Sequence, residues 1–217
     1  MFRNHFRYWW LGTAVFCLTG CTPLREGACG VEEAVDPSVH TVSFPNGEGK
    51  AESRDERWAR PVKLEGVPNL YKVSDDLYRG GQPTSRGMRA LKDAGVKTIV
   101  NLRSFHSDRD EIGDIELNYE HIYMKAWHPE DKEAARFLRI VTDRTKVPVF
   151  VHCKYGADRT GTMCAIYRIA VQGWTKEEAI KEMTGGGYGF HGVWKNLLRY
   201  VDSLDIESIK RKAGLVE

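Results

Sequence analysis

The chain has 217 residues, of which 41% are hydrophobic and 29% are charged. These proportions predict one soluble globular domain with extra sequence at its N-terminus, and they exclude a collagen, a mucin or a polytopic membrane protein. The 32 basic and 30 acidic residues leave a formal charge of +2, and two of the cations lie in a segment that we expect to be removed. Such a nearly neutral chain does not fit a protein held to nucleic acid through its phosphates.

Residues 1–20 have the organisation of a signal peptide. Arg3, His5 and Arg7 precede an apolar stretch over residues 8–18, which is too short to cross a bilayer core of about 30 Å. We therefore expect the chain to be exported. An ordinary cleaved signal peptide and an uncleaved anchor helix remain alternatives to the lipidated form described next.

The apolar stretch ends in the sequence Leu18-Thr19-Gly20-Cys21, which resembles the lipobox of bacterial lipoproteins. This resemblance implies that Cys21 carries a diacylglycerol and begins the mature chain. It also implies a lipid-anchored protein on the periplasmic face of a bacterial envelope. Thr22 is not Asp, which by the sorting rules of Gram-negative hosts favours the outer membrane.

Residues 21–60 are predicted to form a flexible tether. Gly, Glu, Ser and Pro punctuate this segment, and it has no sustained hydrophobic period. Packing of residues 39–44 on the domain is the alternative. The catalytic domain is predicted over residues 61–217.

From residue 61 onward, short β-like runs alternate with helical patterns. This alternation predicts an α/β fold with a central, mostly parallel sheet flanked by helices. In chain order we predict an opening strand or hairpin at 69–79, a helix at 85–94, strands at 96–102 and 118–125, a helix at 131–145, a strand at 148–152, helices at 160–172 and 175–184, and a last helical region from 193 to 204 that extends toward 212.

The remaining cysteines do not form a disulfide framework. Once Cys17 leaves with the signal and Cys21 is lipidated, three remain. If a helix links Cys153 to Cys164, their Cα atoms lie about 16 Å apart, which is beyond bridging distance. Cys29 has no evident partner, and Cys164 is predicted to be a core residue.

Residues 152–161 read His-Cys-Lys-Tyr-Gly-Ala-Asp-Arg-Thr-Gly and join a predicted strand to a predicted helix. A turn of this kind gathers backbone N–H groups at a helix N-terminus, where they favour an anion. Gly156 supplies the necessary backbone freedom, and the Arg159 guanidinium can take two phosphate oxygens at once. The same field favours the thiolate form of Cys153 at neutral pH.

This segment resembles the H-C-x5-R-[ST] signature of the cysteine-dependent phosphatases. The stretches at residues 78–83 (YRGGQP) and 99–103 (IVNLR) extend the resemblance to the atypical dual-specificity phosphatases over roughly residues 67–200. It implies a protein tyrosine phosphatase-like fold, with the loop between the last strand and the following helix. It also implies hydrolysis of phosphomonoesters with no metal or cofactor, and the seven histidines show no ligand spacing.

The resemblance implies that Cys153 attacks phosphorus to form a phosphocysteine, which water then hydrolyses. Arg159 and the loop amides would hold the phosphate oxygens, and the Thr160 hydroxyl would support the thiolate as a leaving group. The substrate-binding residues in the loop would be Lys154, Tyr155, Gly156 and Ala157. The partner is a phosphorylated substrate, either a protein or an inositol phosphate or phosphoinositide.

Three carboxyl groups are candidates for the general acid that protonates the leaving group. Asp131 follows a predicted strand at the edge where sites collect, but it could simply cap the next helix. Asp158 belongs to a Cys-x4-Asp-Arg loop that also resembles the myotubularin-like lipid phosphatases, in which the loop Asp can take the acid role. Glu130 is the third candidate.

Two cations near the loop each have two interpretations. Lys154 could attract a polyanionic substrate or simply be solvated at the rim. Arg103 could reach the phosphate or pair with one of Asp108, Asp110 and Glu111. The glycines of residues 187–192 match a dinucleotide fingerprint, but they follow a helix instead of a strand, so we reject that interpretation. Residues 185–192 could border the pocket or only pack.

Two other functions compete with the phosphatase. A catalytically silent phosphate-binding protein of the envelope would be expected to lack Cys153 or Arg159, and both are present. A rhodanese-like sulfurtransferase also uses a cysteine before a helix, but the Arg-Thr-Gly at residues 159–161 does not fit it.

Overall fold

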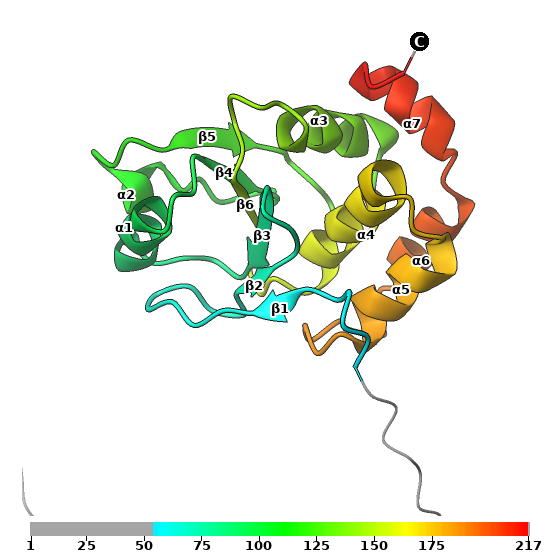
Figure 1. Cartoon of the computed structure of the whole chain (residues 1–217), viewed down its shortest axis with the longest axis horizontal. Coiled ribbons are helices and arrows are strands. Elements are labelled where there is room, and N and C mark those ends of the chain that lie inside the picture. Colours follow the sequence, from blue (N-terminus) through cyan, green and yellow to red (C-terminus); the bar gives the residue numbers. More distant parts are fainter. Residues whose placement is uncertain (1–53, 217) are drawn as a thin grey trace, which may run out of the picture. The chain divides into compact units, whose positions relative to one another are not determined.

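The computed structural model describes residues 54–216. The predicted signal peptide, the anchor Cys21 and most of the predicted tether lie outside the described residues, as do Cys29 and residues 39–44. A six-stranded sheet lies at the centre of the described part, in the order β1-β2-β3-β6-β4-β5 (Figure 1). Its strands are Arg60–Pro61 (β1), Tyr71–Lys72 (β2), Leu77–Gly80 (β3), Thr98–Asn101 (β4), Asn118–His121 (β5) and Val149–His152 (β6).

The predicted α/β fold with a mostly parallel sheet is confirmed. β3, β6, β4 and β5 run parallel, while β1, β2 and β3 pair antiparallel. The carboxyl ends of the four parallel strands therefore meet at one edge of the sheet, where ligands bind in such folds. The loop with Cys153 follows β6, which lies between β3 and β4.

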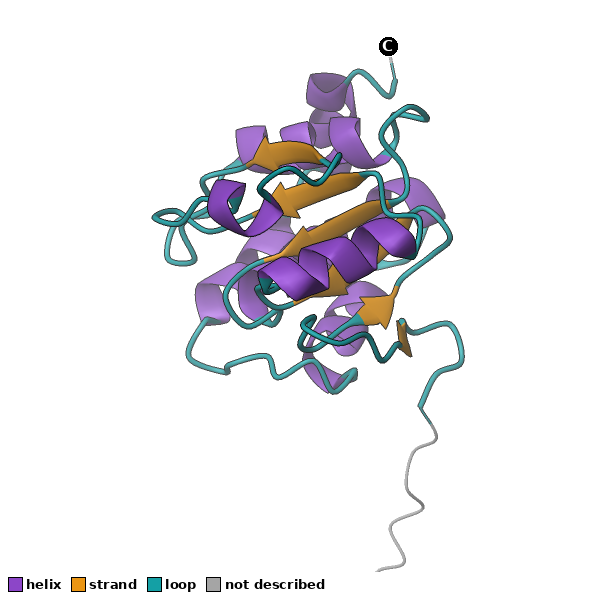
Figure 2. Ribbon diagram, turned by 90° about the vertical axis from the view of Figure 1, so that its left-hand side faces the viewer, coloured by secondary structure: helices purple, strands orange, loops and turns teal. Residues whose placement is uncertain are grey.

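Helices cover both faces of the sheet (Figure 2). They are Ser85–Asp93 (α1), Arg109–Ile112 (α2), Asp131–Val141 (α3), Asp158–Gln172 (α4), Lys176–Gly185 (α5), Lys195–Ser203 (α6) and Ile206–Ala213 (α7). In residues 54–216, no helix combines the length and the apolar character that a bilayer crossing requires.

Alternating side chains of the strands divide the core between the two faces. Ile99 and Phe150 pack with α1 residues such as Met88 and Leu91 in one cluster. The neighbouring strand residues 100, 149 and 151 point the other way and join the larger cluster that α3 to α7 complete. Burial on both faces is why these strands read as continuous apolar runs in the sequence.

The main differences from the predicted elements lie at helix ends. The helix predicted to reach 145 ends at Val141, because Asp143 accepts hydrogen bonds from the backbone and hydroxyl of Thr145 and forms a turn. The last helical region is two helices, because Asp205 caps the second one by accepting from the Ser208 amide at 3.0 Å. α2 was not predicted.

The folded domain begins earlier than the predicted boundary at residue 61. Ala59 is buried, and its amide donates to Glu182 at 2.7 Å. Arg54 donates to the carbonyls of Gly186 and Ala59. Residues 54–60 therefore pack on the domain, although their polar composition is typical of a linker.

Candidate active site

The loop of residues 153–157 joins β6 to α4, as the sequence predicts, and α4 begins two residues earlier than predicted, at Asp158. Gly156 makes this path possible. Its φ is +72°, and a Cβ there would lie 2.3 Å from the carbonyl carbon of Gly80 and 2.5 Å from the amide of Gly81. Only glycine meets both requirements, since the left-handed region disfavours L side chains and the neighbouring backbone leaves no space.

The backbone carbonyls of loop residues 154–156 each accept a hydrogen bond from a group outside the loop. Their donors are, in order, the amide of Gln82 (3.2 Å), the side chain of Asn69 (2.9 Å) and the guanidinium of Arg79 (2.8 Å). Within the described part of the chain, the amides of residues 154–158 have no protein acceptor. These amides are therefore available to an anion at the start of α4, where the loop can form a nest for a phosphate group.

The predicted nucleophile and its neighbours lie around this nest. Cys153 is a free thiol that is 2% exposed, and the half-buried Arg159 donates to the Leu102 carbonyl at 3.3 Å. The Thr160 hydroxyl is buried without a hydrogen-bond partner among the described residues. Cys164 lies in the core, as predicted, where burial raises the pKa of its thiol to about 11.

The predicted rim residues surround the loop. Lys154 and Tyr155 are exposed, and the Lys154 ammonium lies 5.1 Å from the centre of the Tyr155 ring. Ala157 is buried at the N-cap position of α4. Arg103 donates to the Gln82 side chain at 3.0 Å and has no ion pair with the acids of residues 108–111. The backbone amide of Gln82 also binds the loop, so Gln82 connects Arg103 to the loop.

The two leading candidates for the general acid lie in different surroundings. Asp158 is in the first turn of α4, and its carboxylate accepts from the amide of His191 at 2.8 Å and from the ring Nδ1 at 2.9 Å. Asp131 opens α3, and its carboxylate contacts Lys212 at 2.6 Å and the Tyr200 hydroxyl at 3.4 Å. Asp131 is therefore directed toward the C-terminal helices α6 and α7.

Glu130, and not Asp131, is the N-cap residue of α3. It also pairs with Lys132 at 2.6 Å. The hydrogen bond from Lys132 holds the pKa of Glu130 below its usual value, which favours the ionised form. A carboxyl in this state is poorly suited to donate a proton.

Residues 185–192 both pack and border the loop. Tyr188 is buried, and the Arg79 guanidinium lies 3.8 Å from the centre of its ring. Arg79 in turn binds the Gly156 carbonyl. Half-exposed His191 extends from the same segment to Asp158, and its ring centre lies 6.0 Å from that of Tyr155. Sequence reasoning could not find this pairing, because the partners are 33 positions apart.

Sequence reasoning also missed Asp108, which lies beneath the loop at the start of α2. Its carboxylate binds His152 Nε2 at 2.7 Å, and both side chains are 0% exposed. The only signal was a histidine directly before the nucleophile. Nothing in the local sequence connects it to an aspartate 44 positions earlier.

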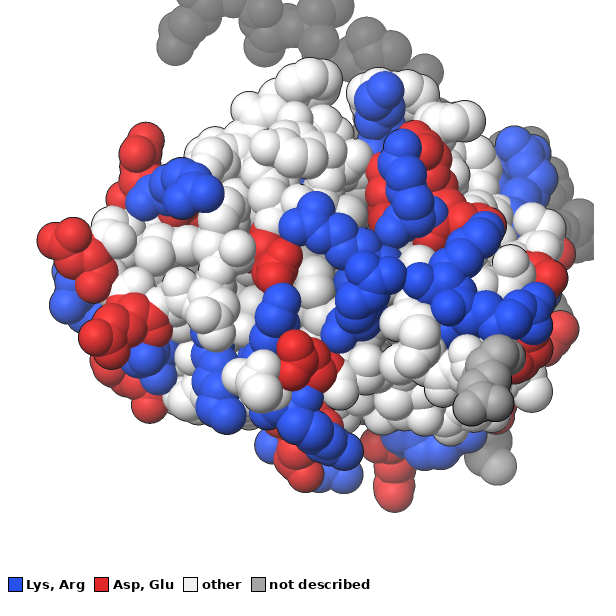
Figure 3. Space-filling view, turned by 90° about the horizontal axis from the view of Figure 1, so that it is seen from above, with Lys and Arg blue, Asp and Glu red and all other residues white. Residues whose placement is uncertain are grey.

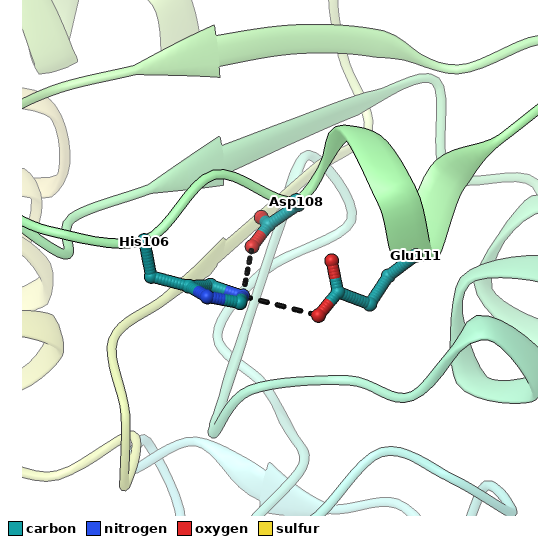
Figure 4. A group of neighbouring side chains, drawn as sticks. All are labelled: His106, Asp108 and Glu111. Atoms are coloured by element: carbon teal, nitrogen blue, oxygen red, sulfur yellow. Dashed lines mark ion pairs between the residues drawn. The ribbon is translucent and has the colours of Figure 1, made fainter. Parts of the chain in front are cut away.

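His106, Asp108 and Glu111 face one another (Figure 4), and their ligand atoms lie within 4.8 Å. His106 Nε2 is 3.6 Å from Asp108 and 3.1 Å from Glu111. Both oxygens of Asp108 already accept hydrogen bonds from other side chains. A cation would have to displace those donors, so we interpret the cluster as an ion-pair network.

A hollow of about 740 Å³ lies along α3 and beside the end of α7, on a face where basic side chains gather (Figure 3). Most of the basic side chains that line this hollow are engaged with other protein groups. Arg136 binds Glu120 and Lys212 binds Asp131, while Arg139 donates to the Lys212 carbonyl. This hollow is distinct from the nest around Cys153.

A buried free thiol that opens a loop with available amides, with an arginine in the first turn of the following helix, is the arrangement of a cysteine-dependent phosphatase. Comparisons with known proteins agree. The family model for the DSP-PTPase phosphatase fused to NAD+ kinase matches residues 58–190. The dual specificity protein phosphatase TpbA of Pseudomonas aeruginosa is 33% identical over 161 residues, which cover 74% of this chain and 72% of TpbA.

Solved structures extend this similarity. The crystal structure of TpbA aligns with a TM-score of 0.67 at 32% identity and covers 75% of this chain and 99% of TpbA as crystallised. A substituted TpbA in complex with phosphotyrosine aligns with a TM-score of 0.66 at 31% identity. The catalytic domain of the yeast PP-IP phosphatase SIW14 shares the fold, with a TM-score of 0.60 at 16% identity.

The chain belongs to the family of tyrosine and dual-specificity phosphatases. It is a phosphoric monoester hydrolase.

Proposed function

We propose that the chain hydrolyses phosphotyrosine through a phosphocysteine formed on Cys153. The observation that carries the proposal is the loop of residues 153–157, in which three carbonyls accept hydrogen bonds from neighbouring segments while the amides have no protein acceptor among the described residues. The complex of a TpbA form with phosphotyrosine supports the choice of substrate. Exposed Tyr155 (58%) offers a ring at the rim against which an aryl group can stack.

Each loop residue has a role in the proposed reaction. The Cys153 thiolate attacks phosphorus, while the amides and the Arg159 guanidinium bind the equatorial oxygens. The aryl oxygen leaves with a proton. Water then attacks the phosphocysteine, and the thiolate leaves with support from the unpartnered Thr160 hydroxyl. Arg103 and Lys154 add positive charge at the rim.

We assign proton donation to the pair formed by Asp158 and His191, and not to Asp131. The supporting observation is that Asp158 immediately precedes Arg159 and orients the half-exposed imidazole of His191 through Nδ1. Because Nδ1 donates to Asp158, the proton given to the leaving group would come from Nε2 of the doubly protonated ring. The Asp131 carboxylate is engaged with Lys212 and Tyr200 instead.

The test of the function is hydrolysis of a phosphotyrosine peptide by the purified, reduced chain in the presence of a chelator, beside C153S and R159K. We expect activity that resists the chelator and falls at least 1,000-fold in C153S and strongly in R159K. An inositol polyphosphate in the same panel tests the alternative that exposed Lys154 favours. Phosphate binding without turnover by the folded protein would instead support a silent binding module.

We propose that the chain acts on phosphorylated substrates at a cell envelope. The lipobox-like sequence before Cys21 supports export and lipidation, with residues 22–53 as the tether. The test is the mass of the chain after expression in a Gram-negative host, together with its partition into detergent. A mature chain that begins at a diacylglyceryl Cys21, and a C21S variant that stays in the aqueous phase, are expected. A chain that retains residues 1–20 would contradict the proposal.

A further inference from the structure

Large apolar side chains stand exposed at the carboxyl edge of the sheet. In the described part of the chain, seven such side chains are exposed, and four of them lie on four different loops: Phe105 (90%), Trp127 (60%), Tyr155 (58%) and Val193 (78%). The first three of these loops directly follow β4, β5 and β6, and the arrows of the parallel strands in Figure 2 point toward this edge. Single exposed apolar residues are ordinary, but a group of them around one site marks a contact surface.

Contacts join these loops into a ring around the predicted nucleophile. We call them the rim loops, and they are residues 102–107, 122–129, 153–157 and 190–196. The Ser104 hydroxyl donates to a carbonyl of the second loop at 2.8 Å, and the Asn196 side chain donates to another carbonyl of that loop at 2.7 Å. The ring centre of His191 lies 6.0 Å from that of Tyr155, and the Leu102 amide donates to the last carbonyl of β6 at 2.9 Å. The four exposed apolar side chains therefore belong to one continuous surface.

The rim loops contain no aspartate or glutamate. Their lysines and arginine are Arg103, Lys125, Lys154 and Lys195, in a chain whose 32 basic and 30 acidic residues nearly balance. The three lysines are exposed, and none of them has an ion pair within residues 54–216. An acid follows each of the first three loops, but these carboxylates are buried or half-buried and are paired with a histidine or a lysine. The exposed charge of the rim loops is therefore positive.

This composition suits an anionic lipid bilayer. Aromatic side chains partition to the boundary between head groups and acyl chains, and lysines beside them contact anionic head groups. Apolar tips on four separate loops suit a fluid partner, whereas a folded protein partner would need a matching hollow for each of them. The lack of carboxylates in all four loops has the same explanation, because an anionic surface would repel them.

We propose that the rim loops dock the domain on an anionic bilayer, with their aromatic tips at the lipid boundary and their lysines against the head groups. The catalytic loop then faces the membrane, which favours substrates whose phosphomonoester lies at the lipid surface. This inference goes beyond the proposed hydrolysis, because docking requires no turnover. A flexible chain of the length of the proposed tether, residues 22–53, would span roughly 30 Å. The proposed lipid anchor would therefore keep the rim loops near the same surface.

Binding to vesicles tests the proposal without catalysis. The chain from Thr22 onward, which carries no lipid, is mixed with vesicles of phosphatidylcholine alone or of equimolar phosphatidylcholine and phosphatidylglycerol, and the bound fraction is measured by flotation. We expect binding at least tenfold tighter to the anionic vesicles, and we expect this binding to weaken as salt rises. C153S should bind like the wild type, so docking and hydrolysis can fail independently.

Two double variants locate the binding surface. F105S/W127S removes two aromatic tips and should weaken binding to the anionic vesicles at least tenfold. K125Q/K195Q removes two of the lysines and should weaken it about tenfold. Both variants should hydrolyse a small aryl phosphate at the wild-type rate, which would show that the fold is kept.

The matched control K92Q/K97Q removes the same charge from exposed positions beside the amino end of β4, and it should bind like the wild type. Wild-type protein that does not bind anionic vesicles would overturn the proposal. Binding that survives in both rim variants would also overturn it, because another surface would then contact the lipid. A raised KM for a phosphotyrosine peptide in the aromatic variant, without vesicle binding by the wild type, would assign the surface to a protein partner instead.

Discussion

At the scale of single residues, Gly156 offers a sharp comparison with Gly173. The two have nearly the same φ, +72° and +71°, but only at Gly156 would a Cβ meet backbone atoms. G173A should therefore cost about 1 kcal/mol of unfolding free energy, from the left-handed conformation alone. G156A should cost roughly 3 kcal/mol and abolish most activity, because the loop must also shift. Urea titrations with parallel assays would measure both effects, and equal losses would contradict the structure.

Glu133 gives the protein a pH-dependent stability. Burial raises the pKa of this carboxyl to about 7, whereas an unfolded glutamate titrates near 4.3. Between these values the folded state retains a proton that the unfolded state releases. The free energy of unfolding therefore falls as pH rises from about 4.3 to 7, by on the order of 3 to 4 kcal/mol, and the loss is complete above that range.

The variant E133Q removes this titration and keeps an acceptor for the Glu130 amide, which Glu133 binds at 3.1 Å. E133Q should match the wild type near pH 4.5 and exceed its stability at pH 8. Exposed E116Q serves as the control, and its difference from the wild type should not vary with pH. Urea unfolding at both pH values measures this, and a constant difference for E133Q would refute the buried-carboxyl interpretation.

At the scale of elements, a buried ion pair joins α4 to α5. Arg168 contacts Glu182 at 2.6 and 2.7 Å, and the two side chains are only 3% and 5% exposed. Replacing one member leaves a buried charge unpaired, so E182Q should cost about 3 kcal/mol. The exposed pair of Glu207 and Lys210 is the control, and E207Q should cost less than about 0.5 kcal/mol. Similar losses in both variants would show that the buried pair is not special.

Most elements could be predicted because their signals are local. The strand at 149–152 begins with three successive apolar residues, Thr175 and Glu178 form the predicted capping box, and Gly173 ends α4 in the left-handed region. The four residues of α2 have no amphipathic period to detect. The split between α6 and α7 depends on Asp205, whose capping competes with an apolar pattern that continues through it.

The active-site residues that stand close together in the sequence could be predicted. Those that only the fold brings together could not. Cys153, Arg159 and the loop between them stand within one short segment. Arg79 lies in β3, Gln82 follows that strand, and Asp108 stands at the start of α2 after β4. These residues become neighbours of the catalytic segment only because β3 and β4 flank β6. Strand order in a parallel sheet is not encoded in any one segment, so these contacts require the structure.

At the scale of the whole molecule, the residues before β1 connect the N-terminal boundary of the domain to the catalytic loop. Ala59 and Tyr188 both donate to Glu182, at 2.7 and 3.0 Å. The Tyr188 ring covers Arg79, which holds the Gly156 carbonyl. Removal of residues 54–60 therefore leaves Glu182 without one hydrogen-bond donor. It also removes contacts beside the side chains of Tyr188 and Arg79, which support the loop.

Two truncated chains test this connection. A chain from Arg54 onward should fold and match the full chain in kcat/KM on a phosphotyrosine peptide. A chain from Pro61 onward, which is the boundary expected from composition, should lose about 2 to 4 kcal/mol of stability and at least tenfold in activity, because a buried donor and the Ala59 contacts disappear. Equal stability and activity of the two would place residues 54–60 in the tether, as their polar composition predicts.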